Sequence, residues 1–290
     1  ILALTFTDKA AAEMHRRIYR ELQKMYAGTD DATQRSRAGA ALDSFFKAQI
    51  MTIDAFCHKI AVTACRRFGI SPDFTIDLTE SKRLAYNLSL DFFLEHRADN
   101  SLQYLLGNQA ITDFINGFFV KILNDYVTVS RPIDFSAALQ NQLSAAERLF
   151  TEYRTQTERI LEGIASYLDN GDKFISAGKE AYRQLPEFPL ALNDPQLPVF
   201  FERLKAIYGV KKTIGSRTDE EVKACKDLCS ALSENSGRLQ SLYHFYAHKE
   251  QMQKIYALCS ILQERFIAEK KRRSILHFGD IAQLAVDALI

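Results

Sequence analysis

Apolar positions at the start of the chain alternate between strand-like runs and helical spacing. The runs 1–6 and 49–53 are short, nearly continuous apolar and β-branched stretches, as in buried strands. After the first run, apolar residues recur at steps of three and four from Ala11 to Met25, which predicts a helix begun by Thr7 and Asp8. The order strand, helix, strand, helix over the first 70 residues predicts part of a parallel α/β sheet.

The two connections of this segment are also predicted from local composition. A polar stretch with Gly and Asp, 27–37, is expected to form a loop. Asp54 is expected to cap the helix after the second strand, and this helix should continue to about residue 67.

Beyond Pro72 the pattern becomes helical. Residues 79–185 show only helical periodicity, apart from a β-branched stretch at 126–132 that predicts a short extended segment. A loop or hinge is predicted by four prolines, at positions 186, 189, 195 and 198.

The last third of the chain is predicted to be helical as well. Residues 199–235 are expected to form helices broken around 209–216, and 236–273 to form one long helix. The basic run 270–273 closes this helix, where cations interact favourably with the helix dipole.

Composition adds limits but no function. With 12 Gly and 6 Pro in 290 residues, long helices are favoured over a many-stranded fold. The net charge of +1 gives no global sign of nucleic-acid binding. Five Cys without a CxxC motif favour reduced thiols and a cytoplasmic location, and we expect no membrane contact because no apolar run is long enough to span a bilayer. The apolar first and last residues suggest an internal piece of a longer protein.

The first strand-to-helix turn carries the most informative motif, Leu4-Thr5-Phe6-Thr7-Asp8-Lys9-Ala10-Ala11-Ala12-Glu13-Met14. The carboxyl ends of strands are where α/β sheets bind ligands, and helix N-termini offer N–H groups to phosphates. An exposed Phe6 would let a base stack on it. The alternative is a plain turn with Phe6 in the core.

A second motif, Met51-Thr52-Ile53-Asp54-Ala55-Phe56-Cys57, lies on the second strand-to-helix turn. A carboxylate at Asp54 cannot donate a hydrogen bond to a phosphate, so the Thr52 hydroxyl and backbone N–H groups are the expected donors. From the two motifs, the residues expected to face DNA are Thr5, Phe6, Thr7, Asp8, Lys9, Thr52 and Phe56.

The two motifs resemble motif Ia and the following T-x-H-S-F motif of the UvrD/RecB/AddA superfamily 1 helicases. Two further segments, 68–76 and 275–281, resemble those by which such proteins leave and re-enter the ATPase core. The chain departs from the family pattern at three positions, with Asp8 for the usual Asn, Asp54 for His and Ala55 for Ser.

The resemblance implies a mainly α fold, in which a large helical insertion is flanked by parts of an incomplete RecA-like α/β core (P-loop NTPase fold). It implies a partial core segment at 1–78, an insertion subdomain at 79–273 and a return segment at 274–290. For the parent protein it implies ATP- and Mg²⁺-dependent 3′-to-5′ translocation on single-stranded DNA during unwinding of double-stranded DNA. The long insertion favours AddA- or RecB-like helicase–nucleases, which act in DNA repair and recombination with a second helicase–nuclease subunit.

Several chemical motifs are absent. The sequence contains no G-x-x-x-x-G-K-[ST] P-loop, so we expect no ATP-binding, catalytic or metal-binding residue and no ATPase activity from this chain alone. The pairs His244/His248 and Cys225/Cys229 have a spacing that can bind zinc but no evident third and fourth ligands, which favours packing. The alternative function is a non-enzymatic helical interaction module that docks a partner subunit.

Overall fold

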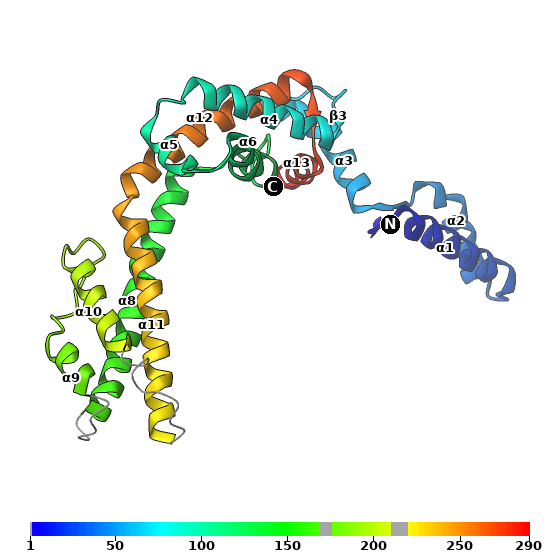
Figure 1. Ribbon diagram of the computed structural model, residues 1–290. Helices are drawn as coiled ribbons and strands as arrows, with labels where there is room; N and C mark the ends of the chain where they lie inside the picture. The colour runs from blue at the N-terminus through cyan, green and yellow to red at the C-terminus, as the bar shows by residue number, and fades with distance from the viewer. Residues whose placement is uncertain (1, 169–175, 210–219) are drawn as a thin grey trace. The chain divides into compact units, whose positions relative to one another are not determined.

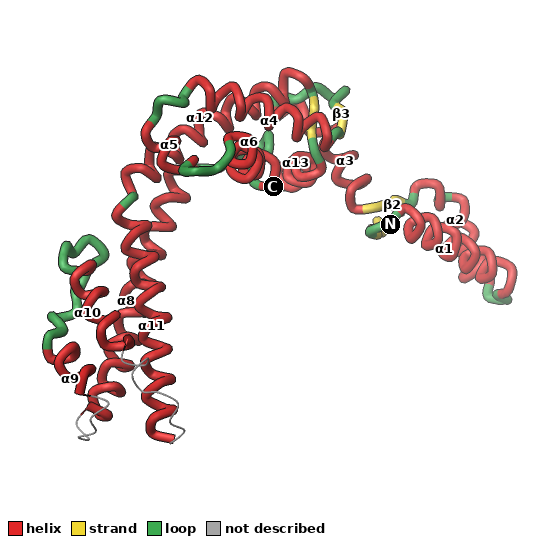
Figure 2. Tube along the Cα trace, viewed as in Figure 1, coloured by secondary structure: helices red, strands yellow, loops and turns green. Residues whose placement is uncertain are grey.

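The computed structural model describes residues 2–168, 176–209 and 220–290, and most of them are helical (Figure 2). They form two compact units. The first unit contains the residues up to Ile133 together with Cys259–Ile290, and the second contains Asp134–Leu258. The mainly α architecture predicted from periodicity is confirmed.

The first unit starts with two parallel strands, β1 (Leu2–Thr5) and β2 (Gln49–Thr52). Their register pairs Leu2 with Gln49 and Thr5 with Thr52, so both strands end at the same edge. The two predicted strands and their parallel arrangement are therefore confirmed.

A helical hairpin connects these strands, formed by α1 (Asp8–Gly28), α2 (Ala32–Asp43) and the 3₁₀ turn η1 (Phe45–Lys47), with α1 and α2 side by side (Figure 1). The prediction of a loop over 27–37 is wrong from residue 32 onward. The carboxylate of Asp31 accepts hydrogen bonds from the N–H groups of Thr33 (2.7 Å) and Gln34 (3.3 Å), which starts a helix within this polar stretch.

The second motif leads into α3 (Ile53–Ala64), followed by the 3₁₀ turn η2 (Cys65–Phe68). The hydroxyl of Thr52, not the carboxylate of Asp54, caps α3, since it accepts a hydrogen bond from the N–H of Ala55 at 3.2 Å. The expectation that Asp54 is the cap is wrong, because Asp54 already lies in the first helical turn. Gly69 ends η2 with a φ of 70°, a conformation that favours glycine.

A second parallel pair consists of the short strands β3 (Thr75–Ile76) and β4 (Ile275–Leu276). The N–H of Thr75 donates to the carbonyl of Ser274 (2.8 Å), and the N–H of Asp77 donates to that of Leu276 (3.0 Å). Helix α13 (Phe278–Leu289) follows β4 and packs against α3. Strands of two residues are too short to give a periodic pattern, so the spacing of apolar residues did not predict them.

The rest of the first unit is helical, as predicted. Its elements are α4 (Leu78–Glu95), α5 (Asn100–Leu106), α6 (Ile111–Phe114), the π-helical turn η3 (Ile115–Val120) and α7 (Lys121–Asp125). Residues 126–132 connect α7 to the next helix without regular secondary structure. Four aromatic rings of α4, α6 and η3 pack edge to face or obliquely in this part of the core, those of Phe92, Phe93, Phe114 and Phe119.

The second unit consists of α8 (Phe135–Leu168), α9 (Ser176–Arg183), α10 (Leu197–Gly209), α11 (Glu220–Ala247) and the first turns of α12 (Lys249–Arg273). The proline-rich stretch lies in the connection from α9 to α10, as predicted. Cys225 and Cys229 are buried in the hydrophobic core of this unit, in agreement with a packing role. The predicted break at 210–216 lies outside the described residues.

The predicted single helix over 236–273 is wrong. The chain forms two helices, α11 and α12, separated at His248. The N–H of His248 lies 3.3 Å from the carbonyl oxygen of His244 and 3.2 Å from that of Phe245. The break coincides with the gap in apolar spacing after Tyr246. Within the described part of the chain, no helix is both long and apolar enough to cross a membrane.

Candidate nucleic-acid interface

The two sequence motifs meet at one edge of the β1–β2 sheet. Thr5 and Thr52 are register partners at the carboxyl ends of the strands, and α1 and α3 each begin within three residues of this pair. The first turn of a helix has N–H groups without intrahelical acceptors and carries the positive end of the helix dipole. This edge is therefore a suitable place for a phosphate.

The first turn buries Thr5 and exposes Phe6. Thr5 is 8% exposed and its hydroxyl donates to the carbonyl of Thr7 at 3.0 Å, so this hydroxyl stabilises the turn. The neighbouring Phe6 is 90% exposed. This exposure contradicts the alternative that Phe6 belongs to the core of this chain, and its ring is available for stacking.

Three polar residues follow Phe6. The hydroxyl of Thr7 accepts a hydrogen bond from the N–H of Ala10 at 3.2 Å and caps α1. Asp8 and Lys9 are both exposed. The carboxylate of Asp8 accepts hydrogen bonds only, and its charge suits the first turn of a helix rather than a phosphate. Lys9 has no hydrogen bond or ion pair with any described residue, so it is the cationic donor of this motif.

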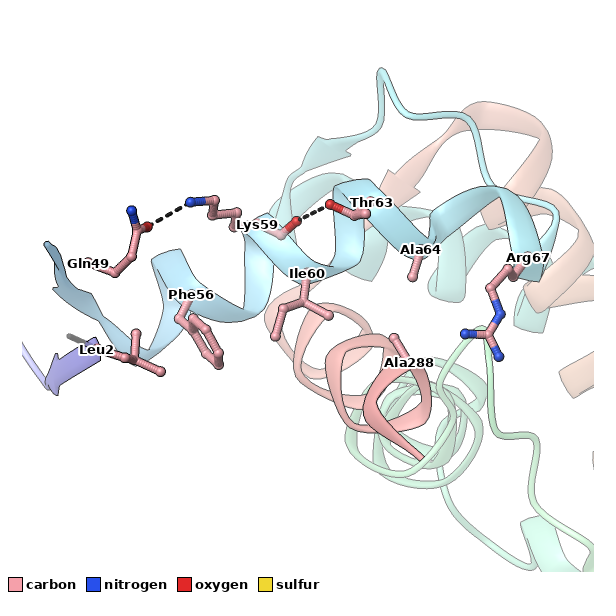
Figure 3. A pocket seen from close by; sticks show the side chains of 9 residues that line it. All are labelled: Leu2, Gln49, Phe56, Lys59, Ile60, Thr63, Ala64, Arg67 and Ala288. Carbon is pink, nitrogen blue, oxygen red and sulfur yellow. Dashed lines mark hydrogen bonds between the residues drawn. The ribbon is translucent and has the colours of Figure 1, made fainter. Parts of the chain in front are cut away.

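The second motif differs, because its aromatic residue faces a pocket. Phe56 is half-buried and lines a pocket of about 550 Å³ together with Leu2, Ile60 and Ala288 (Figure 3). Phe6 does not line this pocket. The structure thus brings the strand ends together but places the two motif phenylalanines in different surroundings.

Sequence reasoning missed the cationic rim of this pocket. Lys59 donates a hydrogen bond to Gln49 of β2 at 2.7 Å, and Arg67 lies at the far end of the lining (Figure 3). Lys59, Thr63 and Arg67 recur at steps of four from the motif onward, a helical spacing visible in the sequence once α3 is assigned.

A buried charged cluster supports α13, the helix that packs on α3. Lys270 and Asp280 are both fully buried and form an ion pair. Asp280 also accepts hydrogen bonds from the N–H groups of Val129 (3.0 Å) and His277 (2.9 Å). His277 Nδ1 lies 2.5 Å from the Asp280 carboxylate, and His277 Nε2 donates to the carbonyl of Asn124 at 3.1 Å. We call Lys270, His277 and Asp280 the buried cluster.

Burial and pairing act in opposite directions on its two charges. Burial lowers the pKa of Lys270, although the neighbouring Asp280 partly offsets this effect. For Asp280, burial raises the pKa, but the hydrogen bond with His277 and the charge of Lys270 together outweigh it and lower the pKa.

The basic run at the end of α12 was expected to act on the helix dipole, and for Lys270 this expectation is wrong. Its partner Asp280 lies beyond β4, in the first turn of α13. Arg272 and Arg273 instead pair with Glu269, and hydrogen bonds from Arg272 and then Arg273 lower the pKa of this exposed carboxyl to about 2.

Residues for ATP and Mg²⁺ do not occur in a fitting arrangement. The sequence has no P-loop. Within the described ranges, no group of three or more His, Cys, Asp or Glu residues is placed to hold a metal ion. The edge formed by the two motifs is therefore a site for contacts with a strand, without a nucleotide.

Comparison with known proteins defines the class. The UvrD/REP helicase N-terminal domain matches residues 1–289, and the chain belongs to this family. Among full-length relatives, the chain is similar to the ATP-dependent helicase/nuclease AddA of Lactococcus lactis subsp. cremoris, with 24% identity over 98% of this chain and 27% of the relative. The protein of the same name from Clostridium beijerinckii is 22% identical over 100% of this chain and 26% of the relative.

A shorter match is stronger. The AddA protein of Lactococcus lactis subsp. lactis is 40% identical over 79 residues, which are 27% of this chain. The chain spans about a quarter of the length of the curated relatives that it matches from end to end.

Proposed function

We propose that this chain supplies single-stranded-DNA contacts to an ATP-dependent DNA helicase, the helicase–nuclease subunit of a DNA repair and recombination exonuclease. The observation that carries the proposal is the exposed Phe6 at the end of β1, followed by Lys9, which no described residue pairs. Membership of the UvrD/REP family and similarity to AddA helicase/nucleases support it. In the whole protein, ATP and Mg²⁺ drive 3′-to-5′ movement along the strand from a site outside these residues.

The contacts follow from the chemistry of the two turns. Phe6 stacks on a base, which is tolerant of sequence because every base has a π face. Lys9 neutralises a phosphate, and the N-termini of α1 and α3 offer N–H groups to the backbone. Thr52 contributes its hydroxyl from the paired strand end. Thr5 acts indirectly, because its hydroxyl already bonds within the turn that presents Phe6.

We propose that β1 and β2 are two strands of a RecA-like core domain, with 1–78 and 274–290 as its parts and 79–273 as a helical insertion. The parallel pairing of β3 with β4 supports this division, because it joins the segments on either side of the insertion. A second helicase–nuclease subunit is the proposed protein partner, and duplex DNA is the substrate that the whole protein unwinds.

The proposal is tested by measuring single-strand affinity and thermal unfolding on the same variants. Phe6→Ala is expected to weaken binding by ~1–3 kcal/mol with little sequence preference, the contribution of one stacked base. Lys9→Ala is expected to weaken binding modestly and to reduce the salt dependence by ~0.7 in the slope of log K against log salt, because one phosphate contact is lost.

Phe278→Ala is the matched control, since Phe278 is also exposed but lies on α13 away from the motif in sequence. It should leave DNA affinity unchanged. If Phe6→Ala lowers the melting temperature but binds DNA like the unmodified chain, Phe6 is a packing residue and the site assignment is wrong.

The alternative function, a non-enzymatic interaction module, is favoured by one observation. Leu190 and Val199 of the second unit are large apolar side chains that are 70% and 57% exposed. Reading the gene upstream of Ile1 separates the two functions. A P-loop motif there supports the helicase, and its absence supports the module.

A further inference from the structure

A second concave surface of the first unit lies on the hairpin of α1, α2 and η1. It encloses about 520 Å³, and its lining includes Arg16, Tyr19 and Arg20 of α1 and Phe45 and Phe46 of η1. We call these five residues the hairpin surface. None of them belongs to the two motifs at the strand ends.

The two adjacent phenylalanines have opposite environments. Phe45 is 7% exposed, and its ring lies 4.7 Å from that of His15 and 5.4 Å from that of Tyr19. Phe46 is 78% exposed, with the ammonium of Lys47 at 5.5 Å from its ring centroid. Phe45 thus anchors the turn, and Phe46 presents a ring to solvent beside a cation.

The two arginines of the hairpin surface are open to an anionic ligand. Arg16 and Arg20 are exposed, and neither forms an ion pair with any residue in the described part of the chain. Arg16 donates to the carbonyl of Ala12 in its own helix, at 3.3 Å. By contrast, Lys24 at the end of the same helix is paired with Glu21 at 2.8 Å.

The hairpin surface continues a line that starts at the first motif. Lys9, Arg16 and Arg20 fall within about 40° of one another around α1, given ~100° per residue, and span ~16 Å along its axis. Glu13 is the one acidic residue on this stripe of α1. At ~3.4 Å per phosphate of a stacked strand, this span corresponds to about five nucleotides.

We propose that the hairpin surface is a second contact for the same single-stranded nucleic acid. Arg16 and Arg20 bind consecutive phosphates, for which the guanidinium fork is well suited, and Phe46 stacks on a base. The proposal rests on the proposed function, since the strand reaches this surface from Phe6 and Lys9. Two guanidinium groups beside an exposed ring match a nucleic-acid strand better than an acidic protein, which has no bases to stack.

The test measures binding of oligothymidylates from ~4 to ~16 nucleotides, the range of site sizes for single-strand grooves, to the 290-residue chain. The double variant Arg16→Gln/Arg20→Gln should bind the shortest strand normally and the longest more weakly, with a salt slope reduced by ~1.4 for the long strand. Phe46→Ala should weaken only long strands, by ~5- to 150-fold.

Arg17→Gln is the matched control, because Arg17 lies outside the stripe and interacts electrostatically with Glu21. It should bind all lengths normally. The proposal is overturned if the double variant binds long strands like the unmodified chain, or weakens short and long strands equally.

The outcomes also separate the two proposals. Loss of short-strand binding in Phe6→Ala supports the motif site, whatever the hairpin variants do. Unchanged binding in Phe6→Ala with a length-dependent loss in the hairpin variants would contradict the motif site alone. No binding of any length by the unmodified chain would contradict both.

Discussion

Substitution of Lys270 by Met should strongly destabilise the first unit. The change keeps the length of the apolar stem but removes the ammonium that faces Asp280 in the core. Asp280 then stays buried, held by hydrogen bonds to backbone N–H groups and beside His277, but without its cationic partner. Removal of one member of a buried ion pair costs ~3–5 kcal/mol, a large part of the ~5–15 kcal/mol that stabilises a typical domain.

The assay is urea unfolding at neutral pH, followed by far-UV circular dichroism. Lys271→Met is the matched control, because Lys271 is the next residue on α12 and is half-buried. It should change the free energy of unfolding by less than ~0.5 kcal/mol. In a double-mutant cycle, Asp280→Asn should cost less in the Lys270→Met background than in the unmodified chain. Equal stability of the two single lysine variants would refute the reasoning.

Three further outcomes are expected. Ser274→Gly should raise the free energy of unfolding in urea by ~0.5–1 kcal/mol, because Ser274 has a φ of 53°. Acid titration should unfold the chain less steeply in Asp280→Asn. The lowered pKa of Asp280 stabilises the fold above its ordinary range near ~3.9, and this contribution is lost as pH falls through the lowered value. Iodoacetamide labelling mapped by mass spectrometry should modify half-buried Cys57 before Cys259, whose burial raises its pKa to about 12.

The elements with strong periodic patterns could be predicted from sequence, and those set by single contacts could not. The parallel strands β1 and β2 and the helices of both units follow from apolar spacing. Helix α2 was missed because one carboxylate, Asp31, starts a helix in a stretch whose composition is typical of a loop. The start of α3 was misplaced because Thr52, the last strand residue, also serves as its cap.

The site was predictable to the same degree. The motif pattern predicted an exposed Phe6, and the structure agrees. The burial of Lys270 was not predictable, because its charge is neutralised across the turn at β4 by Asp280, which also binds Val129, 151 positions earlier. The hairpin surface was missed for a similar reason, since Arg20 and Phe46 come together only when α1 and η1 pack.

The central claim, that the first strand-to-helix turn contacts single-stranded DNA, is tested most directly by photochemical crosslinking. A bromodeoxyuridine-substituted strand is bound to the chain and irradiated, and the crosslinked residues are identified by mass spectrometry. An exposed aromatic ring stacked on a base is a favourable crosslinking site. The account predicts a crosslink to Phe6, which is lost in Phe6→Ala and kept in Phe278→Ala. Crosslinks confined to residues 134–258, with none in the first turn, would contradict it.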